Sequence, residues 1–236
     1  MITSVQNQKV KAYTKLQQKK YRDQQKQFIV EGEHLVIEAV KAHVALEILG
    51  TETNTRFTNL ELVSEAVMKK ITATKNPPKI IAICKQQFPT FLSDKVLILE
   101  NIQDPGNLGT LLRSALAFDF KTIILDQCVD LFNPKVIRAT QGALFQLAYF
   151  YQDTETFKLN NPKYKILITS VTKTINQTKP EPPYALVLGN EGQGIKTQTM
   201  KLSDHRLHIP TTQVESLNVS VAGSILMQAL ANPSIF

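Results

Sequence analysis

The chain has 236 residues, and its 27 Lys plus Arg against 20 Asp plus Glu give a formal net charge of +7. This length fits one large domain or two small ones. Two cysteines without a pairing pattern argue against a disulfide-stabilised secreted protein, and the longest apolar runs are far shorter than the ~20 residues that span a membrane. With no apolar signal core after Met1, a cytoplasmic protein without membrane contact is expected.

The positive charge is concentrated at the N-terminus. Residues 1–27 contain seven basic residues and one acidic residue, a net of +6, while the rest of the chain has a net of +1. Such a cluster is typical of a surface that binds polyanions. A solvated helix face is an equally good interpretation of the charge alone. The basic residues of this segment are Lys9, Lys11, Lys15, Lys19, Lys20, Arg22 and Lys26.

The first ninety residues predict a small α/β domain. Sparse apolar residues at intervals of three or four predict one polar helix over residues 6–27. Residues 85–93 resemble a linker, so the predicted domains are 1–92 and 93–236. Strands are expected over 28–30, 45–49, 60–63 and 80–84, and helices over 33–40 and 65–71, the second with Ser64 as its N-cap.

The second domain alternates strands and helices, which predicts a largely parallel sheet covered on both faces. Ligand sites in such sheets lie beyond the carboxyl ends of the strands. Strands are expected over 96–99, 122–125, 165–169 and 185–188, and helices over 108–118, from Asn133-Pro134 onward, and over about 217–230.

Three turns at the ends of these strands have unusual chemistry. In the first, Asp104-Pro105-Gly106 is a strong turn signal, Asn107 is the expected helix cap, and Arg113 follows less than two helical turns later. A well-capped connection with a solvent-facing arginine would explain this turn equally well.

The second turn has three glycines within residues 189–194, directly after an apolar strand, which suggests backbone pressed against a ligand. Its order of glycines differs from that of a dinucleotide-binding turn, and no Gly-Lys-Ser/Thr follows as in a phosphate-binding loop. In the third turn, Ser216 is the expected cap of an apolar helix. Asn218 at the start of that helix either fixes local backbone or contacts a ligand.

Nothing in the sequence indicates a metal site. The four histidines, His34, His43, His205 and His208, lack ligand spacing and are expected to be ordinary surface or packing residues.

Taken together, the three turns resemble the three ordered motifs of the SpoU/TrmH RNA 2′-O-ribose methyltransferases, which belong to the SPOUT superfamily. The resemblance rests on residues 101–115, on Leu188-Gly-Asn-Glu-Gly-Gln-Gly194 and on residues 209–222. Residues 133–143 are similar to the family segment between the first two motifs. Residues 28–39 are similar to a substrate-binding domain of ribosomal-protein type.

The resemblance implies a fold, a cofactor and a chemistry. The fold would be a small α/β substrate-binding domain followed by an α/β SPOUT domain with a mostly parallel sheet and a deep trefoil knot. The cofactor would be S-adenosylmethionine, held by Leu188, Gly189, Asn190, Glu191, Gly192, Ile209, Pro210, Ser216, Leu217 and Asn218. The catalytic residues would be Arg113, Asn107, Glu191, Ser216 and Asn218.

The resemblance also implies partners. The substrate would be RNA, with ribosomal RNA favoured because family members that act on transfer RNA often lack the extra N-terminal domain. Arg113 and Arg138 would join the N-terminal basic residues in contacting RNA, no DNA binding is expected, and the chain would form a homodimer through its C-terminal domain. The alternatives are a transfer RNA 2′-O-methyltransferase and a non-catalytic RNA-binding protein of ribosome assembly with the same fold.

Overall fold

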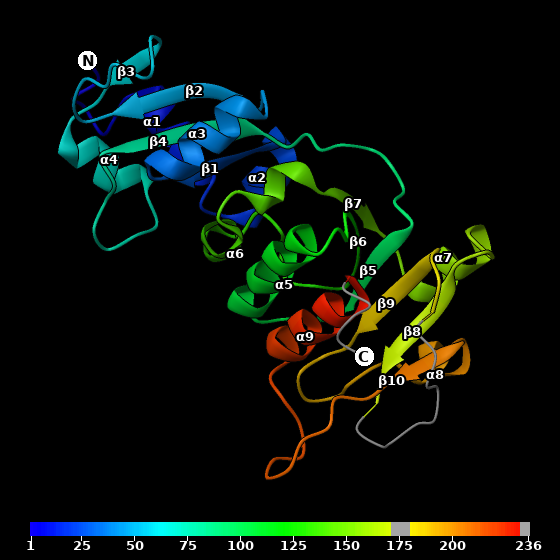
Figure 1. Cartoon of the computed structure of the whole chain (residues 1–236). Coiled ribbons are helices and arrows are strands. Elements are labelled where there is room, and N and C mark those ends of the chain that lie inside the picture. The colour runs from blue at the N-terminus through cyan, green and yellow to red at the C-terminus, as the bar shows by residue number, and fades with distance from the viewer. Residues whose placement is uncertain (171–179, 232–236) are drawn as a thin grey trace. The chain divides into compact units, whose positions relative to one another are not determined.

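A computed structural model describes residues 1–170 and 180–231, and these residues form two compact units. The first unit contains residues 1–87 together with residues 130–145, and the second contains residues 88–129 and the chain from residue 146 onward. Segment 130–145 therefore packs with the N-terminal part of the chain, although it lies within the sequence of the C-terminal half. Figure 1 shows the helices and strands of both units.

The first unit is built on a four-stranded sheet in the order β1-β4-β2-β3. Strands β1 and β2 flank β4 in antiparallel pairs, and β3 pairs with β2 in parallel. All residues of β4 except the last are buried, as expected for a strand with a neighbour on each side. The elements are α1 (Gln8–Lys15), α2 (Lys19–Gln25), β1 (Gln27–Glu31), α3 (Glu33–Lys41), β2 (Ala45–Gly50), β3 (Leu60–Leu62), α4 (Glu65–Ile71), β4 (Ile80–Lys85) and α6 (Pro134–Thr140).

The basic N-terminal segment forms two helices instead of the single helix predicted from its periodicity. Helix α1 ends at Lys15 and α2 begins at Lys19, and between them Leu16 enters the core. Val10 and Tyr13 on α1 belong to the same core, packed with residues of β2, α4 and β4. The narrow apolar stripe of this segment is therefore part of the domain interior, and the segment is not a separable arm.

Arg22 corrects the expectation that all seven N-terminal basic residues bind RNA. Its side chain is only 4% exposed, and it donates to the backbone carbonyls of Leu16 and Gln17 at 2.8 Å each, where the chain breaks between the two helices. Its guanidinium also forms an ion pair with Asp130, which begins segment 130–145. A buried, fully engaged guanidinium is not available to a phosphate.

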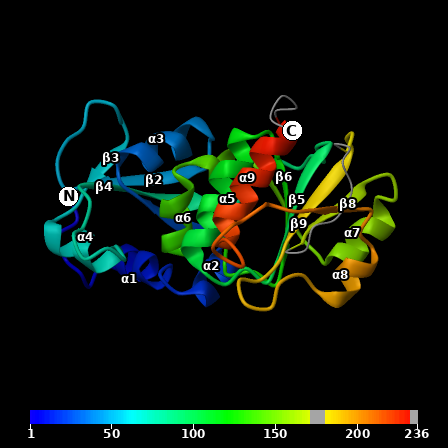
Figure 2. The same cartoon turned by 60° about the horizontal axis from the view of Figure 1, so that its bottom comes forward.

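The second unit contains a six-stranded sheet in the order β10-β8-β9-β5-β6-β7, and every neighbouring pair is parallel. This confirms the prediction of a largely parallel sheet. Figure 2 shows α5 and α9 on one face of the sheet and α7 and α8 on the other. The elements are β5 (Lys95–Glu100), α5 (Pro105–Ala117), β6 (Thr122–Asp126), β7 (Ala148–Tyr151), α7 (Thr154–Asn160), β8 (Lys165–Thr169), β9 (Tyr184–Leu188), α8 (Thr197–Lys201), β10 (His205–Leu207) and α9 (Val219–Ala231).

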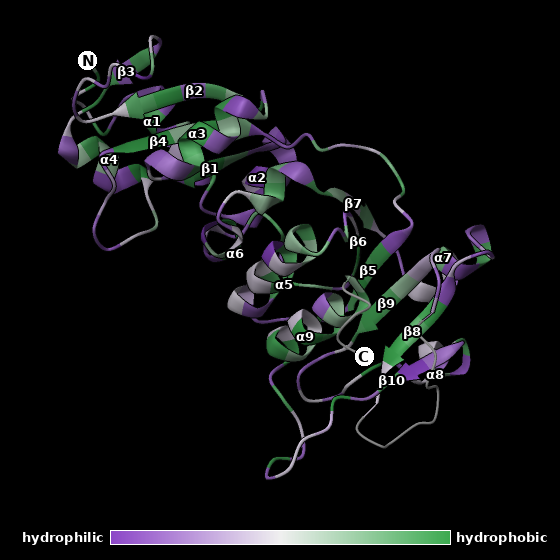
Figure 3. Ribbon diagram, viewed as in Figure 1, coloured by the Kyte–Doolittle hydropathy of each residue, from purple (hydrophilic) through white to green (hydrophobic). Residues whose placement is uncertain are grey.

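The strands of this sheet alternate their side chains between two apolar layers. Val96 and Ile98 of β5 pack with Phe157 of α7 on one face. Figure 3 shows the hydrophobic character of β8 and the hydrophilic character of β10 at the edge of the sheet. Strands β7 and β10 and helices α7 and α8 were not predicted, because the strands are short edge strands and the helices have seven and five residues. No helix of residues 1–170 and 180–231 is long and apolar enough to cross a membrane.

The buried pair of Arg22 and Asp130 generates a stability prediction. Arg22→Ala should lower the free energy of unfolding by about 3 kcal/mol, because it leaves the Asp130 carboxylate and two backbone carbonyls without their donor. Lys20→Ala, on the same helix but exposed, should change it by no more than about 0.5 kcal/mol. Urea unfolding of both variants measures the difference, and equal stability of the two would contradict the structural role of Arg22.

Candidate functional site

The glycine turn after β9 is held by hydrogen bonds between its own residues. The backbone groups of Asn190 and Gly194 exchange hydrogen bonds of 3.0 and 2.9 Å, and a Cβ on Gly189 would lie 2.3 Å from the backbone of Gly194. The Asn190 side-chain oxygen accepts from the amides of Gly192 and Gln193 at 2.9 and 3.0 Å. Gly189 is therefore required by a close approach of two backbone segments.

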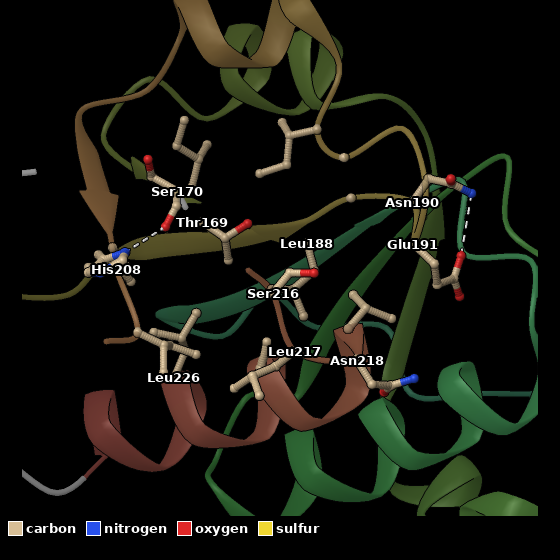
Figure 4. A pocket seen from close by; sticks show the side chains of 18 of the residues that line it. Thr169, Ser170, Leu188, Asn190, Glu191, His208, Ser216, Leu217, Asn218 and Leu226 are labelled. Carbon is tan, nitrogen blue, oxygen red and sulfur yellow. Dashed lines mark hydrogen bonds between the residues drawn. The ribbon is translucent and has the colours of Figure 1, made fainter. Parts of the chain in front are cut away.

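A cavity of about 510 Å³ opens beside this loop in the second unit. This volume lies within the range typical of sites for small molecules and cofactors. Leu188, Leu217 and Leu226 give apolar walls, and Figure 4 shows the polar Thr169, Ser170 and Ser216 facing the same space. The lining residues come from segments 168–170, 188–195, 206–209 and 215–219, with Met200, Thr211, Ala222 and Leu226.

Most of the predicted cofactor residues meet at this cavity. Leu188, Gly189, Asn190, Glu191, Gly192, Ile209, Ser216, Leu217 and Asn218 all line it. Pro210 does not, although its neighbours Ile209 and Thr211 do. The carboxyl ends of the parallel strands bring these segments together, as expected for such a sheet.

Four amide and carboxylate side chains connect the three predicted turns. The Asn107 amide donates to Glu191 Oε1 at 2.9 Å, and the Asn218 amide donates to Asn107 Oδ1 at 3.0 Å. The Asn190 amide donates to the backbone oxygen of Asn101 at 2.9 Å and lies 3.4 Å from Glu191 Oε2. The network orients the Glu191 carboxylate at the cavity, while Asn107 is outside the cavity lining.

Two predicted helix caps are wrong, and both errors concern residues of this network. Asp104, not Asn107, caps α5, because its side chain accepts from the backbone nitrogen of Asn107 at 2.8 Å. Asn218, not Ser216, caps α9, since its Oδ1 accepts from the backbone nitrogen of Ser220 at 2.9 Å. The first change leaves the Asn107 side chain free to reach Glu191, and the second leaves Ser216 free to line the cavity.

Arg113 lies on the exposed side of α5 and does not line the cavity. Within residues 1–170 and 180–231, its guanidinium makes no hydrogen bond or ion pair. An unpaired guanidinium on the helix that carries Asn107 is suited to hold an anionic group near the network.

The sequence analysis missed one wall of the cavity. Thr169 is the last residue of β8 and Ser170 follows it, and the rule that ligands bind at the carboxyl ends of strands could have indicated both. His208 was expected to be an ordinary packing or surface residue, but it lines the cavity. Its Nδ1 lies 3.1 Å from the backbone oxygen of Ser170 (Figure 4). No sequence signal pointed to His208, because the short strand β10 before it was not predicted.

The basic residues of the first unit that were predicted to contact RNA differ in whether a carboxylate pairs with them. Lys11, Lys15, Lys20 and Lys26 are exposed, and the ammonium groups of Lys15 and Lys20 lie 5.3 and 6.0 Å from the centre of the Tyr21 ring. The other three exposed or partly exposed basic residues are paired with carboxylates: Lys9 with Glu47 and Glu61, Lys19 with Asp23, and Arg138 with Glu31.

Comparison with known proteins agrees with this geometry. The model of the SpoU rRNA Methylase family matches residues 94–228, and that of the MRM3-like substrate binding domain matches residues 7–82. The chain belongs to the SpoU rRNA methylase family. All three turns that form and surround the cavity fall within the matched SpoU region.

Full-length relatives share both parts of the chain. The 23S rRNA (guanosine(2553)-2′-O)-methyltransferase RlmP of Bacillus subtilis is 34% identical, and the alignment covers 97% of this chain and 98% of that protein. The human mitochondrial rRNA methyltransferase 3 is 26% identical over 88% of this chain and 68% of that protein. The crystal structure of an AdoMet-bound rRNA methyltransferase from Sinorhizobium meliloti has a TM-score of 0.85 and 27% identity, with 100% of this chain and 98% of that chain covered.

Proposed function

We propose that this SpoU family member transfers a methyl group from S-adenosylmethionine to a ribose 2′-hydroxyl of ribosomal RNA, in the cytoplasm. The observation that carries the proposal is that the second and third motif turns line one cavity at the carboxyl edge of the parallel sheet, and that Asn107 of the first turn is hydrogen-bonded to Glu191 and Asn218 of the other two. The names of the relatives supply the substrate class: an rRNA guanosine 2′-O-methyltransferase in Bacillus subtilis and an AdoMet-bound rRNA methyltransferase in Sinorhizobium meliloti.

The residues of the cavity fit the cofactor. Its volume suits a nucleoside-sized ligand, leucines on two sides offer flat apolar contact to a base, and hydroxyl groups of Thr169, Ser170 and Ser216 offer hydrogen bonds to polar groups. Leu188, Gly189, Asn190, Glu191 and Gly192 would hold one side of it, and Ile209, Ser216, Leu217 and Asn218 the other. When bound, S-adenosylmethionine supplies an electrophilic sulfonium methyl group.

The chain's own residues then have to hold the nucleotide and stabilise the charge that develops on its 2′-oxygen. A guanidinium has five N–H donors and no acceptor, so the role of Arg113 is to hold a substrate phosphate and favour the developing alkoxide, not to act as a base. Asn107, fixed between Glu191 and Asn218, orients the nucleotide. The carboxylates of Glu191 and Glu215 line the cavity, so each is a candidate acceptor for the hydroxyl proton.

We also propose the domain division 1–92 and 93–236 and the deep trefoil knot that the family resemblance implies. The matched ranges 7–82 and 94–228 support the division, although segment 130–145 packs with the first unit. Helix α9 packs on α5 so tightly that a Cβ on Gly223 would lie 2.5 Å from side-chain atoms of Leu111 and Leu188. That close approach supports a C-terminal segment held deep against the core of the second unit.

The proposed catalytic role of Arg113 predicts a loss of methyl transfer without a loss of cofactor binding. Calorimetry should show S-adenosylmethionine binding to both the wild type and Arg113→Ala, whereas methyl transfer to ribosomal RNA should fall by about 10³-fold or more in the variant, because a transition-state contact is lost. Arg56→Ala, a change of an exposed arginine in the first unit, is the matched control and should retain activity.

Cofactor calorimetry and the mapping of 2′-O-methyl groups separate the alternative functions. A wild-type chain that binds no S-adenosylmethionine at millimolar concentration would favour the non-catalytic assembly protein. Mapping 2′-O-methyl groups in total RNA from cells with and without this protein would identify the nucleotide, and a missing methyl in transfer RNA would favour the transfer RNA alternative.

The exposed lysines of the first unit lead to a prediction about the salt dependence of RNA binding. Lys15→Gln with Lys20→Gln should weaken RNA binding and reduce the slope of log K against log salt concentration by about 1–2, because fewer counterions are released. The control pair Lys41→Gln with Lys79→Gln removes two exposed lysines paired with Glu38 and Glu52 and should leave the slope unchanged. Deleting residues 1–27 is not a suitable test, because it would remove Val10, Tyr13 and Leu16 from the core.

We further propose a homodimer through the C-terminal domain. Val221 and Ile225, one turn apart on α9, are 47% and 41% exposed. The opposite side of α9 packs on α5, where a Cβ on Gly223 would lie 2.5 Å from a side-chain atom of Leu111. An exposed apolar strip on an otherwise packed helix is suited to contact a second copy of the chain.

Sedimentation tests this proposal. The wild type should sediment at twice the chain mass, and Val221→Glu with Ile225→Glu should sediment as a monomer because two charges cannot be buried in an apolar contact. Leu159→Glu, at an 81% exposed leucine of α7, should remain dimeric. A monomeric wild type would disprove the dimer.

A further inference from the structure

Glu100 is a buried carboxylate outside the cavity. It is the last residue of β5, it is 1% exposed, and it directly precedes the first motif turn. It does not line the cavity. A buried carboxylate is tolerated only with hydrogen-bond partners, so the identity of those partners indicates what it holds in place.

The partners of Glu100 come from two parts of the second unit. Oε1 accepts from Thr199 Oγ1 at 2.5 Å and from Thr154 Oγ1 at 2.6 Å, and Oε2 accepts from the backbone nitrogen of Lys196 at 3.0 Å. Thr154 begins α7, Lys196 directly follows the loop 189–195, and Thr199 lies on α8. Both threonine side chains are buried, at 1% and 2% exposure.

The Lys196 side chain reinforces the same attachment. Its Nζ forms an ion pair at 2.5 Å with Asp126, the last residue of β6 and the register partner of Glu100. Burial alone would lower the pKa of the Lys196 ammonium, but the hydrogen bond and charge of Asp126 raise it above its ordinary value. The segment after the glycine turn is thus bound to the ends of two neighbouring strands.

The glycine turn is consequently fixed at both ends to adjacent residues. At its start the Asn190 amide donates to the oxygen of Asn101, and at its end Lys196 and Thr199 donate to Glu100. Ile195 and Met200, which line the cavity, each stand next in sequence to a residue that binds Glu100. A shift of Lys196 and Thr199 relative to Glu100 would therefore move the parts of the cavity wall formed by Ile195 and Met200.

We infer that Glu100 is a positioning residue for S-adenosylmethionine: through Lys196 and Thr199 it sets the glycine turn and the wall formed by Ile195 and Met200. The inference rests on the proposed function, in which the cavity holds that cofactor. Glu100 contacts neither the cofactor nor the RNA, so its effect falls on cofactor affinity and not on RNA affinity.

Two threonines that donate to the same carboxylate oxygen give a matched test. Thr199→Val and Thr154→Val each remove one hydroxyl with little change of shape. Thr199→Val should raise the dissociation constant and the KM for S-adenosylmethionine roughly tenfold, with the KM for RNA unchanged, because a hydrogen bond to a charged group is lost on the segment that forms the wall. Thr154→Val should leave cofactor binding within about twofold. Thr199→Ser, which keeps the hydroxyl, should restore wild-type binding.

Thermal unfolding of the variants separates positioning from stability. Both valine variants should lower Tm by similar amounts, while only Thr199→Val weakens the cofactor. Equal cofactor binding by Thr199→Val and Thr154→Val would overturn the inference. A wild type that binds no S-adenosylmethionine would instead overturn the proposed function, so the two failures are distinguishable by the wild-type calorimetry alone.

Discussion

The carboxyl end of β5 is the constraint on which the site depends. Strand β5 lies between β9 and β6, and parallel hydrogen bonding on both sides fixes where it ends. The eight residues from Glu100 to Asn107 then hold the glycine turn and the polar network: Glu100 binds the end of the glycine turn, Asn101 binds its start, Asp104 caps α5, and Asn107 connects Glu191 with Asn218. The cofactor cavity and the proposed catalytic network therefore share one rigid support, as a site needs when geometry contributes to catalysis.

The N-terminal charge has two different uses in the first unit. Arg22 is buried and stabilises the break between two helices and the start of segment 130–145, whereas Lys15 and Lys20 are exposed beside Tyr21. Basic residues of the same segment therefore serve two purposes: the buried Arg22 stabilises the fold, and the exposed Lys15 and Lys20 remain on the surface. This division also explains why charge substitutions, and not a truncation, are the appropriate way to examine RNA binding by this unit.

The elements with a clear local signal were predictable, and β7, β10, α7 and α8, which have none, were not. Ser64 and Asn133 were correctly identified as caps, because the local sequence alone provides the acceptor and the following helix. Strands β7 and β10 have only four and three residues, so no period could be recognised in them. The single helix expected over residues 6–27 is in fact broken, because Leu16 gains more from burial in the core than the helix gains from continuity.

The sequence by itself determined the alternation of strands and helices, the three motif turns, and nearly all the residues that line one side of the cavity, because these depend on local patterns of glycines, caps and apolar runs. Tertiary structure decided which polar side chains meet. Asn107 and Asn218 lie 111 residues apart and became partners only because α5 and α9 pack on the same face of the sheet. Glu100, Thr199 and His208 gave no sequence signal, since a buried carboxylate or a cavity-lining imidazole is defined by its neighbours in space and not by its neighbours in the chain.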